Sequence, residues 1–511
     1  MNFSRRFLFV AALLLLAAVS AAYLPYVGKG FKQDDFGWIA ASRARQGADW
    51  AALLTRNTGF YRPVVAVTFA LDELAFGMSP LGYGLTNLAL LLACLFAIAG
   101  LARTLGLLPG AALAAGAIWA LNFQGINMAV VWTSGRTALL LVLFAVLAAH
   151  AFIRSAGSGL PFGFARGRQA GTMTAAALFT LLALLSKEEA VMLPILLFVW
   201  AGLIADGVLR DPGSGVGGAG IGRDDHLFRS PIPDPDTPTN APWFSVRRAV
   251  RTAWPLAVPL IVYAALRHFS GAFGPLSAPS YYRMTFAPLS VAENALKYLD
   301  FAATTPAVAL LLGSMLAWST PRPSRSESRI VLLGLVWLVA GYAITVFLPI
   351  RSPLYACFPA VGAALAAAAL LGAAWSRSTA AARLRLAVAG LVLPFLLLPV
   401  YWARNVRHAK GAQLSAQLLH DLEAARPEIP VDHVLILLDD PRLDRSERLP
   451  AAFGTLYDIA VRDTLGRPVR TWIEPPPDGW QLAGLRPPDP ATPKVVFALR
   501  NGHLVRLKNE Q

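Results

Sequence analysis

The sequence predicts an all-α polytopic membrane protein with a small C-terminal α/β soluble domain. Of its 511 residues, 56% are hydrophobic and only 15% are charged, and the mean hydropathy is +0.52. Soluble proteins carry about 25% charged residues, so this composition argues against a soluble globular fold. The two cysteines, Cys94 and Cys357, lie inside apolar runs. This favours small core residues over a disulfide framework or a zinc site.

The apolar runs predict about eleven transmembrane helices. The first run, from Phe7 to Gly28, has no charged residue, and about 20 apolar residues suffice to cross the hydrocarbon core. Each run must be helical, because only a helix satisfies its own backbone polar groups in a bilayer. Ser20–Ala22 resembles a signal-peptidase site, so a cleaved signal peptide is the alternative for the first run. The other runs are centred on residues 83–102, 108–122, 137–153, 171–186, 189–206, 254–267, 299–318, 330–348, 353–375 and 386–403.

The net charge of +15 agrees with this topology. With a cytoplasmic N-terminus, arginines recur in every predicted inner loop, whereas the short outer loops hold isolated cations only. This is the bias of the positive-inside rule. It places the C-terminal residues outside the cytoplasm, and we expect a multi-pass protein of a bacterial inner membrane. The basic excess therefore indicates topology, and we expect no nucleic-acid partner.

Two domains are predicted. Residues 1–403 form the transmembrane domain, with a first outer loop at 27–82, predicted as interfacial helix around Trp38 and Trp50, and a cytoplasmic linker at 207–245. The linker is rich in Gly, Pro and Asp, so we expect it to be disordered. Residues 404–511 form an extracytoplasmic α/β domain. Its predicted elements are a helix at 410–426, a strand at His433–Leu438, a helix at Leu449–Leu465 and a hairpin at Val495–Leu507 that turns at Asn501–Gly502.

The adjacent carboxylates Asp34 and Asp35 are the sharpest candidates for chemistry. They lie just past the first apolar run, on the predicted outer side and near the membrane interface. A carboxylate in this place can act as a general base toward an acceptor hydroxyl, or it can hold a divalent cation. The alternative is that one of them caps the following helix and the other is solvated.

Charges at the outer ends of apolar helices form a second group of candidates. A charge at the bilayer centre costs about 2.5–3.5 kcal/mol, so these residues either anchor a helix at the interface or have a function. The function we consider is a phosphate clamp for a lipid carrier, in which arginine offers a bidentate fork and lysine a point charge. The candidate cations are Arg62, Arg136, Lys187 and Arg351, and the candidate substrate contacts beside them are Glu188 and Tyr355.

Several short motifs follow one another in a recognisable order between about residues 30 and 370. They are Asp34-Asp35, Tyr61–Pro63, Leu81–Leu88, Trp132–Thr137, Leu185–Pro194 and Arg351–Tyr355, followed by Pro359 and Gly362. In this order they resemble the motifs of the C-type (GT-C fold) membrane glycosyltransferases. They are most similar to the polyprenyl- or dolichyl-phosphate-mannose O-mannosyltransferase group that in animals carries tetratricopeptide repeats. This chain lacks the repeats, and it has Gly84 and Asn122 where the group commonly has histidines.

The resemblance implies an inverting enzyme that acts on the outer face of the membrane. It would transfer a sugar, a mannose-like hexose, from a polyprenyl-phosphate donor to a hydroxyl of a protein, glycan or lipid. Asp34 would be the general base with Asp35 assisting it, and Arg136, Lys187 and Arg351 would hold the donor phosphate. Because a few cations can stabilise a departing phosphate, no cofactor is required, although a divalent metal is compatible with the reaction.

Two other functions compete with this interpretation. A transporter or flippase for an anionic lipid or solute would use the same outer cations. It would also need polar groups deep within several helices, whereas the polar groups of this chain gather at outer helix ends. A scaffold whose tail binds partners is the third interpretation.

Overall fold

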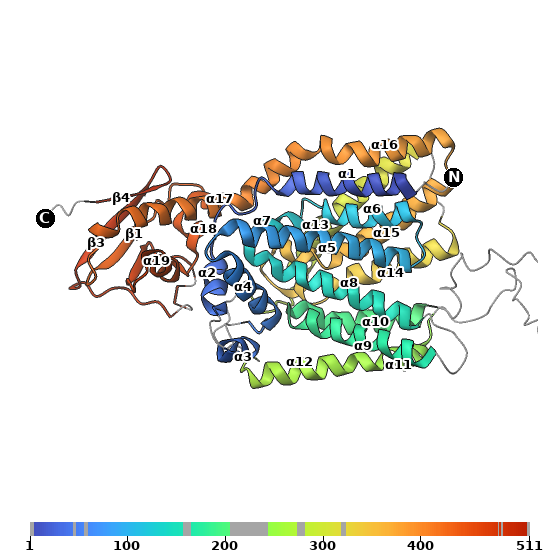
Figure 1. Cartoon of the computed structure of the whole chain (residues 1–511), viewed down its shortest axis with the longest axis horizontal. Helices are drawn as coiled ribbons and strands as arrows, with labels where there is room; N and C mark the ends of the chain where they lie inside the picture. The colour runs from blue at the N-terminus through green and yellow to red at the C-terminus, as the bar shows by residue number, and fades with distance from the viewer. Residues whose placement is uncertain are drawn as a thin grey trace, which may run out of the picture.

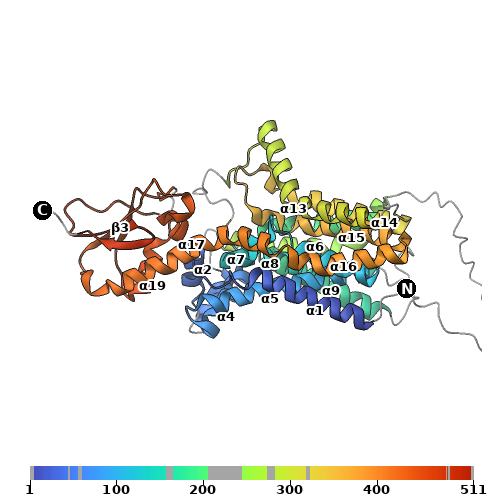
Figure 2. The same cartoon turned by 90° about the horizontal axis from the view of Figure 1, so that it is seen from above.

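The structure, a computed structural model, describes residues 5–43, 47–55, 60–156, 165–204, 244–272, 282–317, 323–478, 480–481 and 484–507. Long helices lie side by side in a bundle, and a small α/β domain follows at one end (Figures 1 and 2). This confirms the predicted fold class. The predicted linker at 207–245 falls almost wholly outside the described residues.

The long helices are α1 (Arg5–Tyr23), α5 (Pro80–Thr104), α8 (Arg136–Ala156), α9 (Ala165–Leu184), α13 (Pro288–Ala317), α14 (Arg325–Tyr342), α15 (Pro359–Arg377), α16 (Ala380–Leu396) and α17 (Leu398–Ala424). The shorter helices are α2 (Asp34–Ser42), α3 (Gly47–Thr55), α4 (Pro63–Phe76), α6 (Pro109–Ala120), α7 (Ile126–Val131), α10 (Met192–Leu203), α11 (Val246–Ala253), α12 (Ala257–Phe269), α18 (Leu449–Phe453) and α19 (Tyr457–Leu465). The 3-10 helices are η1 (Thr133–Gly135), η2 (Glu188–Val191), η3 (Trp254–Leu256), η5 (Thr345–Phe347), η6 (Pro353–Ala356), η7 (Arg426–Glu428) and η8 (Arg445–Glu447). The strands are β1 (Val434–Leu438), β2 (Thr471–Glu474), β3 (Lys494–Arg500) and β4 (His503–Arg506).

Fewer helices than predicted are long enough to cross a membrane. Within the described ranges, six segments are long and apolar enough, and the pair α16 and α17, bent by 40°, makes a seventh if it counts as one span. The predicted count of eleven is therefore not confirmed. Predicted crossings such as α6 and α10 have 12 residues each, which span about 18 Å, less than the roughly 30 Å of the hydrocarbon core. The six segments are Arg6–Tyr23, Pro80–Thr104, Thr133–Ser155, Val246–Phe269, Pro288–Ala317 and Pro359–Arg377.

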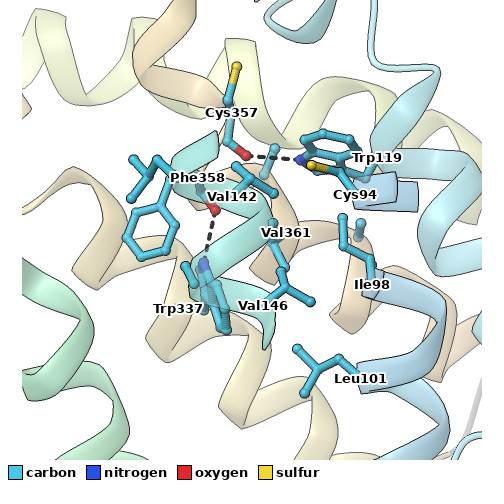
Figure 3. Close-up of a cluster of buried hydrophobic side chains, with 14 of the residues drawn as sticks. Cys94, Ile98, Leu101, Trp119, Val142, Val146, Trp337, Cys357, Phe358 and Val361 are labelled. Atoms are coloured by element: carbon cyan, nitrogen blue, oxygen red, sulfur yellow. Dashed lines mark hydrogen bonds between the residues drawn. The ribbon is translucent and has the colours of Figure 1, made fainter. Parts of the chain in front are cut away.

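Two buried tryptophans fix the start of α15 in the middle of the bundle (Figure 3). The indole N–H of Trp119 in α6 donates to the Cys357 carbonyl at 2.9 Å. The indole N–H of Trp337 in α14 donates to the Phe358 carbonyl at 2.8 Å. Both carbonyls lie in the turn before α15, so neighbouring helices set where α15 begins. Cys94 and Cys357 are buried free thiols in the same cluster.

The end of α1 packs as part of the bundle. The Tyr23 hydroxyl donates to the Ala120 carbonyl at 2.9 Å, and the Asn405 amide of α17 donates to the Ala22 carbonyl at 2.8 Å. Both bonds are buried. They connect the first helix to α6 and to the helix that leads into the C-terminal domain.

The first loop and the C-terminal domain share one hydrophobic core. Phe36 and Trp38 of α2 are buried, and the Phe36 ring lies 6.1 Å from the ring of Phe453 in α18. Arg43, just after α2, forms an ion pair of 2.9 Å with Asp463 of α19. α4 and the C-terminal domain thus cover the apolar side of α2, and the predicted position of this loop at the membrane interface stays a prediction.

The C-terminal domain contains a four-stranded sheet with the order β2-β1-β3-β4. β1 is parallel to β2 and β3, and β3 is antiparallel to β4. The β3–β4 hairpin turns at Asn501 and Gly502, which both have positive φ, as expected for an Asn-Gly turn. β2 was not predicted from the sequence, because it has only four residues and is followed directly by Pro475. α17 runs unbroken across residues 403 and 404 and joins the bundle to this domain (Figure 1).

α14 and α15 pack closely through two glycines. A Cβ on Gly362 of α15 would overlap the carbonyl oxygen of Gly334 and would lie 2.7 Å from the Leu338 nitrogen. Small residues allow such close approach of helix backbones within membranes.

We expect Gly362→Ala to destabilise the protein by about 1–3 kcal/mol, the usual cost of overpacking. The measurement is thermal unfolding of the purified protein in detergent. Gly100→Ala in α5 is the matched control, because a Cβ at Gly100 meets nothing within 4 Å. Equal melting temperatures for both variants would contradict the close contact of α14 and α15.

Candidate active site

Asp35 holds the start of α2 against the bundle. Its side chain is 1% exposed. One carboxylate oxygen accepts hydrogen bonds from the Ser134 hydroxyl and, at 2.7 Å, from the Ser134 N–H; the other accepts from the Lys32 N–H at 2.9 Å. Desolvation raises the pKa of Asp35 to about 6, although the bonds from Ser134 and Lys32 and the charge of Lys32 oppose this rise. Asp35 is thus engaged in joining α2 to η1.

Asp34, the first residue of α2, is in the opposite situation. Its side chain is exposed, and within the described part of the chain it has no hydrogen-bond or ion-pair partner. Desolvation by the surrounding protein raises the pKa of the Asp34 carboxyl above its usual value, and the positive charge of Arg62 opposes this rise. Asp34 is therefore the member of the pair that can meet a substrate.

Arg62 and Glu188 form an ion pair near Asp34. The Nη2 atom of Arg62 lies 2.7 Å from Oε2 of Glu188, and Nε donates to the same carboxylate at 3.1 Å. Arg62 directly precedes α4, and Glu188 begins η2. A backbone bond from the Val64 N–H to the Leu185 carbonyl, 3.3 Å long, keeps these two segments together. Desolvation tends to raise the pKa of Glu188, but Arg62 outweighs it and the pKa is lowered.

Arg267 is a further cation of this cluster, and it is not among the site residues predicted from the sequence. It lies at the end of α12, and its Nη1 is 3.9 Å from Oε1 of Glu188 and donates to the Tyr263 hydroxyl at 2.7 Å. The signal that could have identified Arg267 was its position at the end of the predicted apolar run 254–267. A mostly apolar groove lies beside α12, and its lining residues are Val191, Leu260, Ile261, Tyr263, Ala264 and Arg267.

Lys187 forms the next ion pair of the cluster, with Glu189. Its Nζ lies 2.8 Å from Oε2 of Glu189, and both side chains are buried. The ammonium group also lies 4.8 Å from the centre of the Tyr355 ring in η6. Glu189 interacts electrostatically with Arg62 as well, so the two ion pairs are neighbours. Lys187, Glu188 and Tyr355 thus lie close together, and their predicted roles toward a substrate stay predictions.

Arg351 lies at the margin of the cluster. Its Nη2 is 2.5 Å from Oε2 of Glu293, and its Nε donates to the Asn294 side chain at 2.7 Å. The Arg351 side chain is 42% exposed. Arg351 therefore connects the start of α13 to the segment before η6, and its exposed guanidinium remains accessible from outside.

Arg136 is not among the ion pairs of this cluster. Its side chain is fully buried, and its Nη2 forms an ion pair of 2.6 Å with Asp72 of α4. The other guanidinium nitrogens donate to the Asn87 side chain at 3.1 Å and to the Thr68 carbonyl at 3.3 Å, and Nη2 also donates to the Tyr83 carbonyl at 3.2 Å. These contacts join α8 to α4 and α5, and the predicted contact of Arg136 with a donor phosphate stays a prediction.

A metal site is not apparent in the described ranges. No three His, Cys, Asp or Glu side chains come together there in a way that would hold an ion. Asp34 stands alone, and Glu188 and Glu189 are each paired with a cation. Metal dependence stays an open prediction of the sequence analysis.

Comparisons with known proteins bear on the fold. No family model and no curated protein matches the sequence. Among solved structures, the chain is similar to ArnT from Cupriavidus metallidurans in the apo state, with a TM-score of 0.51 and 13% identity over 95% of this chain and 92% of that one. The chain has a GT-C fold. At this identity the likeness shows the fold alone, so the O-mannosyltransferase group stays a prediction.

Two further structures are similar to this GT-C chain. ArnT from Cupriavidus metallidurans bound to undecaprenyl phosphate aligns with a TM-score of 0.47 and 13% identity, over 96% of this chain and 92% of that one. The archaeal oligosaccharyltransferase AglB from Archaeoglobus fulgidus, in complex with an inhibitory peptide and a dolichol-phosphate, aligns with a TM-score of 0.46 and 11% identity. That alignment covers 91% of this chain and 64% of AglB.

We expect Arg136→Met to lower the free energy of unfolding by about 3–5 kcal/mol, because it leaves the buried Asp72 carboxylate without its partner. Denaturant or thermal unfolding in detergent measures this. The double variant Arg136→Met/Asp72→Leu should recover much of the loss. A normally stable Arg136→Met protein that has lost only its affinity for undecaprenyl phosphate would instead support the clamp.

Proposed function

We propose that the protein is a membrane glycosyltransferase that transfers a sugar from a polyprenyl-phosphate donor to a hydroxyl acceptor, with Asp34 as the general base. The observation that carries the proposal is an accessible, unpaired carboxylate beside a cationic cluster. That cluster consists of Arg62, Lys187 and Arg267 with Glu188 and Glu189. The GT-C fold supports the proposal as an analogy, since fold by itself does not establish function.

In the proposed reaction, the acceptor hydroxyl attacks the anomeric carbon of the sugar while its proton passes to an oxygen of Asp34. The bond between the anomeric carbon and the phosphate oxygen breaks on the opposite side. The configuration therefore inverts, and the phosphate leaves with the electron pair. A general base has to reach the hydroxyl in its unprotonated form, and Asp34 is exposed and free of an ion pair. Asp35, fixed by Ser134, would orient α2 so that Asp34 faces the substrate.

The cationic cluster suits the donor phosphate. The cluster offers three cations, Arg62, Lys187 and Arg267, that a donor phosphate could contact directly. Preorganised cations also stabilise the charge that develops on the departing phosphate. The groove beside α12 is lined by apolar side chains together with Arg267, a lining that would suit part of a prenyl chain with its phosphate at Arg267. Arg62 and Lys187 would assist there, with Glu188 and Tyr355 as substrate contacts and Arg351 at the margin.

The sidedness of the reaction is also part of the proposal. α1 begins at the end of the bundle that is far from α2, α4 and the C-terminal domain (Figure 1). The N-terminus and the site therefore lie at opposite ends of the bundle. We propose that the N-terminus is cytoplasmic and that the site and the C-terminal domain face outside, in a bacterial inner membrane. By the sequence resemblance, the sugar would be a mannose-like hexose, and the acceptor would be a protein, glycan or lipid.

Asp34→Asn should reduce transfer by about 100- to 10,000-fold, the usual contribution of general base catalysis. The measurement is incorporation of radiolabelled mannose from undecaprenyl-phosphate-mannose into lipid-extracted envelope material. Binding of undecaprenyl phosphate and thermal stability should be unchanged. Asp432→Asn, at an exposed position of the C-terminal domain, is the matched control. Normal transfer by Asp34→Asn would refute the assignment, and movement of labelled lipid across vesicles without transfer would favour a transporter.

Arg267→Gln should weaken donor binding by about 10- to 100-fold, because a hydrogen bond to a charged group contributes about 1.5–3 kcal/mol. Titration with undecaprenyl phosphate in detergent measures the affinity. Arg500→Gln, at an exposed arginine of β3, controls for loss of positive charge alone. Unchanged affinity in Arg267→Gln would exclude the groove on α12 as the donor site.

A further inference from the structure

The segment directly before Asp34 has an unusual backbone. Gln33 has a φ of 49° and a ψ of −122°, a conformation that residues with a Cβ rarely adopt. Such a conformation persists only when its surroundings impose it, and it is most common at functional sites. Since Gln33 is the N-cap of α2, its conformation sets the direction in which α2 and Asp34 leave the preceding chain.

The groups that impose this conformation come from the C-terminal part of the chain. The Gln33 N–H donates to the Ala452 carbonyl at 2.9 Å, and its side-chain amide donates to the Pro450 carbonyl at 3.3 Å. Both carbonyls belong to α18. The neighbouring Lys32 donates from its ammonium group to the His408 carbonyl of α17 at 2.7 Å. Each bond joins the segment before Asp34 to a residue more than 370 positions away.

Close backbone packing excludes an alternative path for this segment. A Cβ on Gly30 would overlap the Ala412 carbonyl of α17. A Cβ on Gly411 would lie 2.6 Å from the Ala451 carbonyl of α18 and 3.5 Å from Cδ of Lys32. α17, α18 and residues 30–33 therefore lie in direct contact, and a single added methyl group would displace one from another.

We propose that α17 and α18 of the C-terminal part position the general base, by holding Gln33 in the conformation that directs Asp34 toward the substrate. This inference rests on the proposed function of Asp34. Asp34 is then held through both of its neighbours in the chain. Asp35 is hydrogen-bonded to Ser134 of the bundle, and Gln33 is hydrogen-bonded to α18. Gln33 and Gly411 are positioning residues, because they act through Asp34 and do not touch the reacting atoms.

The first test is Gly411→Ala, a change that lies wholly within α17. We expect the kcat for mannose transfer from undecaprenyl-phosphate-mannose to fall at least 10-fold, while the KM for this donor changes less than 2-fold. The acid limb of the kcat profile should also move to lower pH, because a displaced Asp34 would be better solvated and would lose the rise of its pKa. Gly390→Ala in α16 is the matched control, since a Cβ at Gly390 meets nothing within 4 Å.

The second test changes Gly30, which packs against α17 from the segment before Asp34. Gly30→Ala should give the same loss of kcat with the same donor KM. Gly106→Ala is its control, because Gly106 also has positive φ but a Cβ there meets nothing within 4 Å. Gly30→Ala decides the question if Gly411→Ala no longer binds undecaprenyl phosphate and is therefore misfolded.

The outcomes separate this inference from the proposed function. If Asp34→Asn abolishes transfer while a glycine variant that binds undecaprenyl phosphate keeps the wild-type kcat, the positioning inference is overturned and the proposed function stands. If Asp34→Asn transfers sugar normally, Asp34 is not the general base. The positioning inference then fails together with that assignment. An equal fall of kcat and donor affinity in the glycine variants, with no shift of the acid limb, would indicate a merely structural role and would also overturn the inference.

Discussion

The bonds between Asp35 and Ser134 are the constraint on which the site depends. The bundle supplies Ser134 from the turn before α8, and Asp35 uses one carboxylate oxygen to accept from both donors of this serine. A buried carboxylate is costly unless it is hydrogen-bonded, so α2 has one favourable place against the bundle. The two adjacent carboxylates therefore have different roles. Asp35 fixes the helix, and Asp34 is left exposed at its first turn.

The cations at the predicted outer ends of helices also fall into two groups. Arg136 begins an apolar helix, yet it is buried with Asp72 and joins helices. Lys187 and Arg62 are also paired, but their partners lie on the same short segment, η2. Ion pairs that share one segment can exchange partners when an anion arrives. A fully enclosed pair such as Arg136 with Asp72 cannot do so without unfolding its surroundings.

Much of the fold and part of the candidate site could be predicted from the sequence. The features that could not be predicted were missed for physical reasons. Hydropathy identified the bundle and the Asn501–Gly502 turn identified the hairpin, because both signals are local. The number of membrane spans could not be predicted from hydropathy. Apolar helices such as α6 are too short to cross the membrane alone and depend on neighbouring helices. The burial of Arg136 could not be predicted, because its partner Asp72 is 64 residues away and looks like an ordinary surface acid. Arg267 was missed because a single cation after an apolar run is common.

The shared core of the first loop and the C-terminal domain has a consequence for how such a chain can diverge. Phe36 and Trp38 are completed by side chains such as Phe453, which belong to the opposite end of the sequence. A change of shape in one segment therefore has to be matched by the other. A tail grafted from another GT-C chain would bring a mismatched surface to α2, so recombination would have to exchange the loop together with the tail. For the same reason, the tail produced alone would present an uncovered apolar face to water.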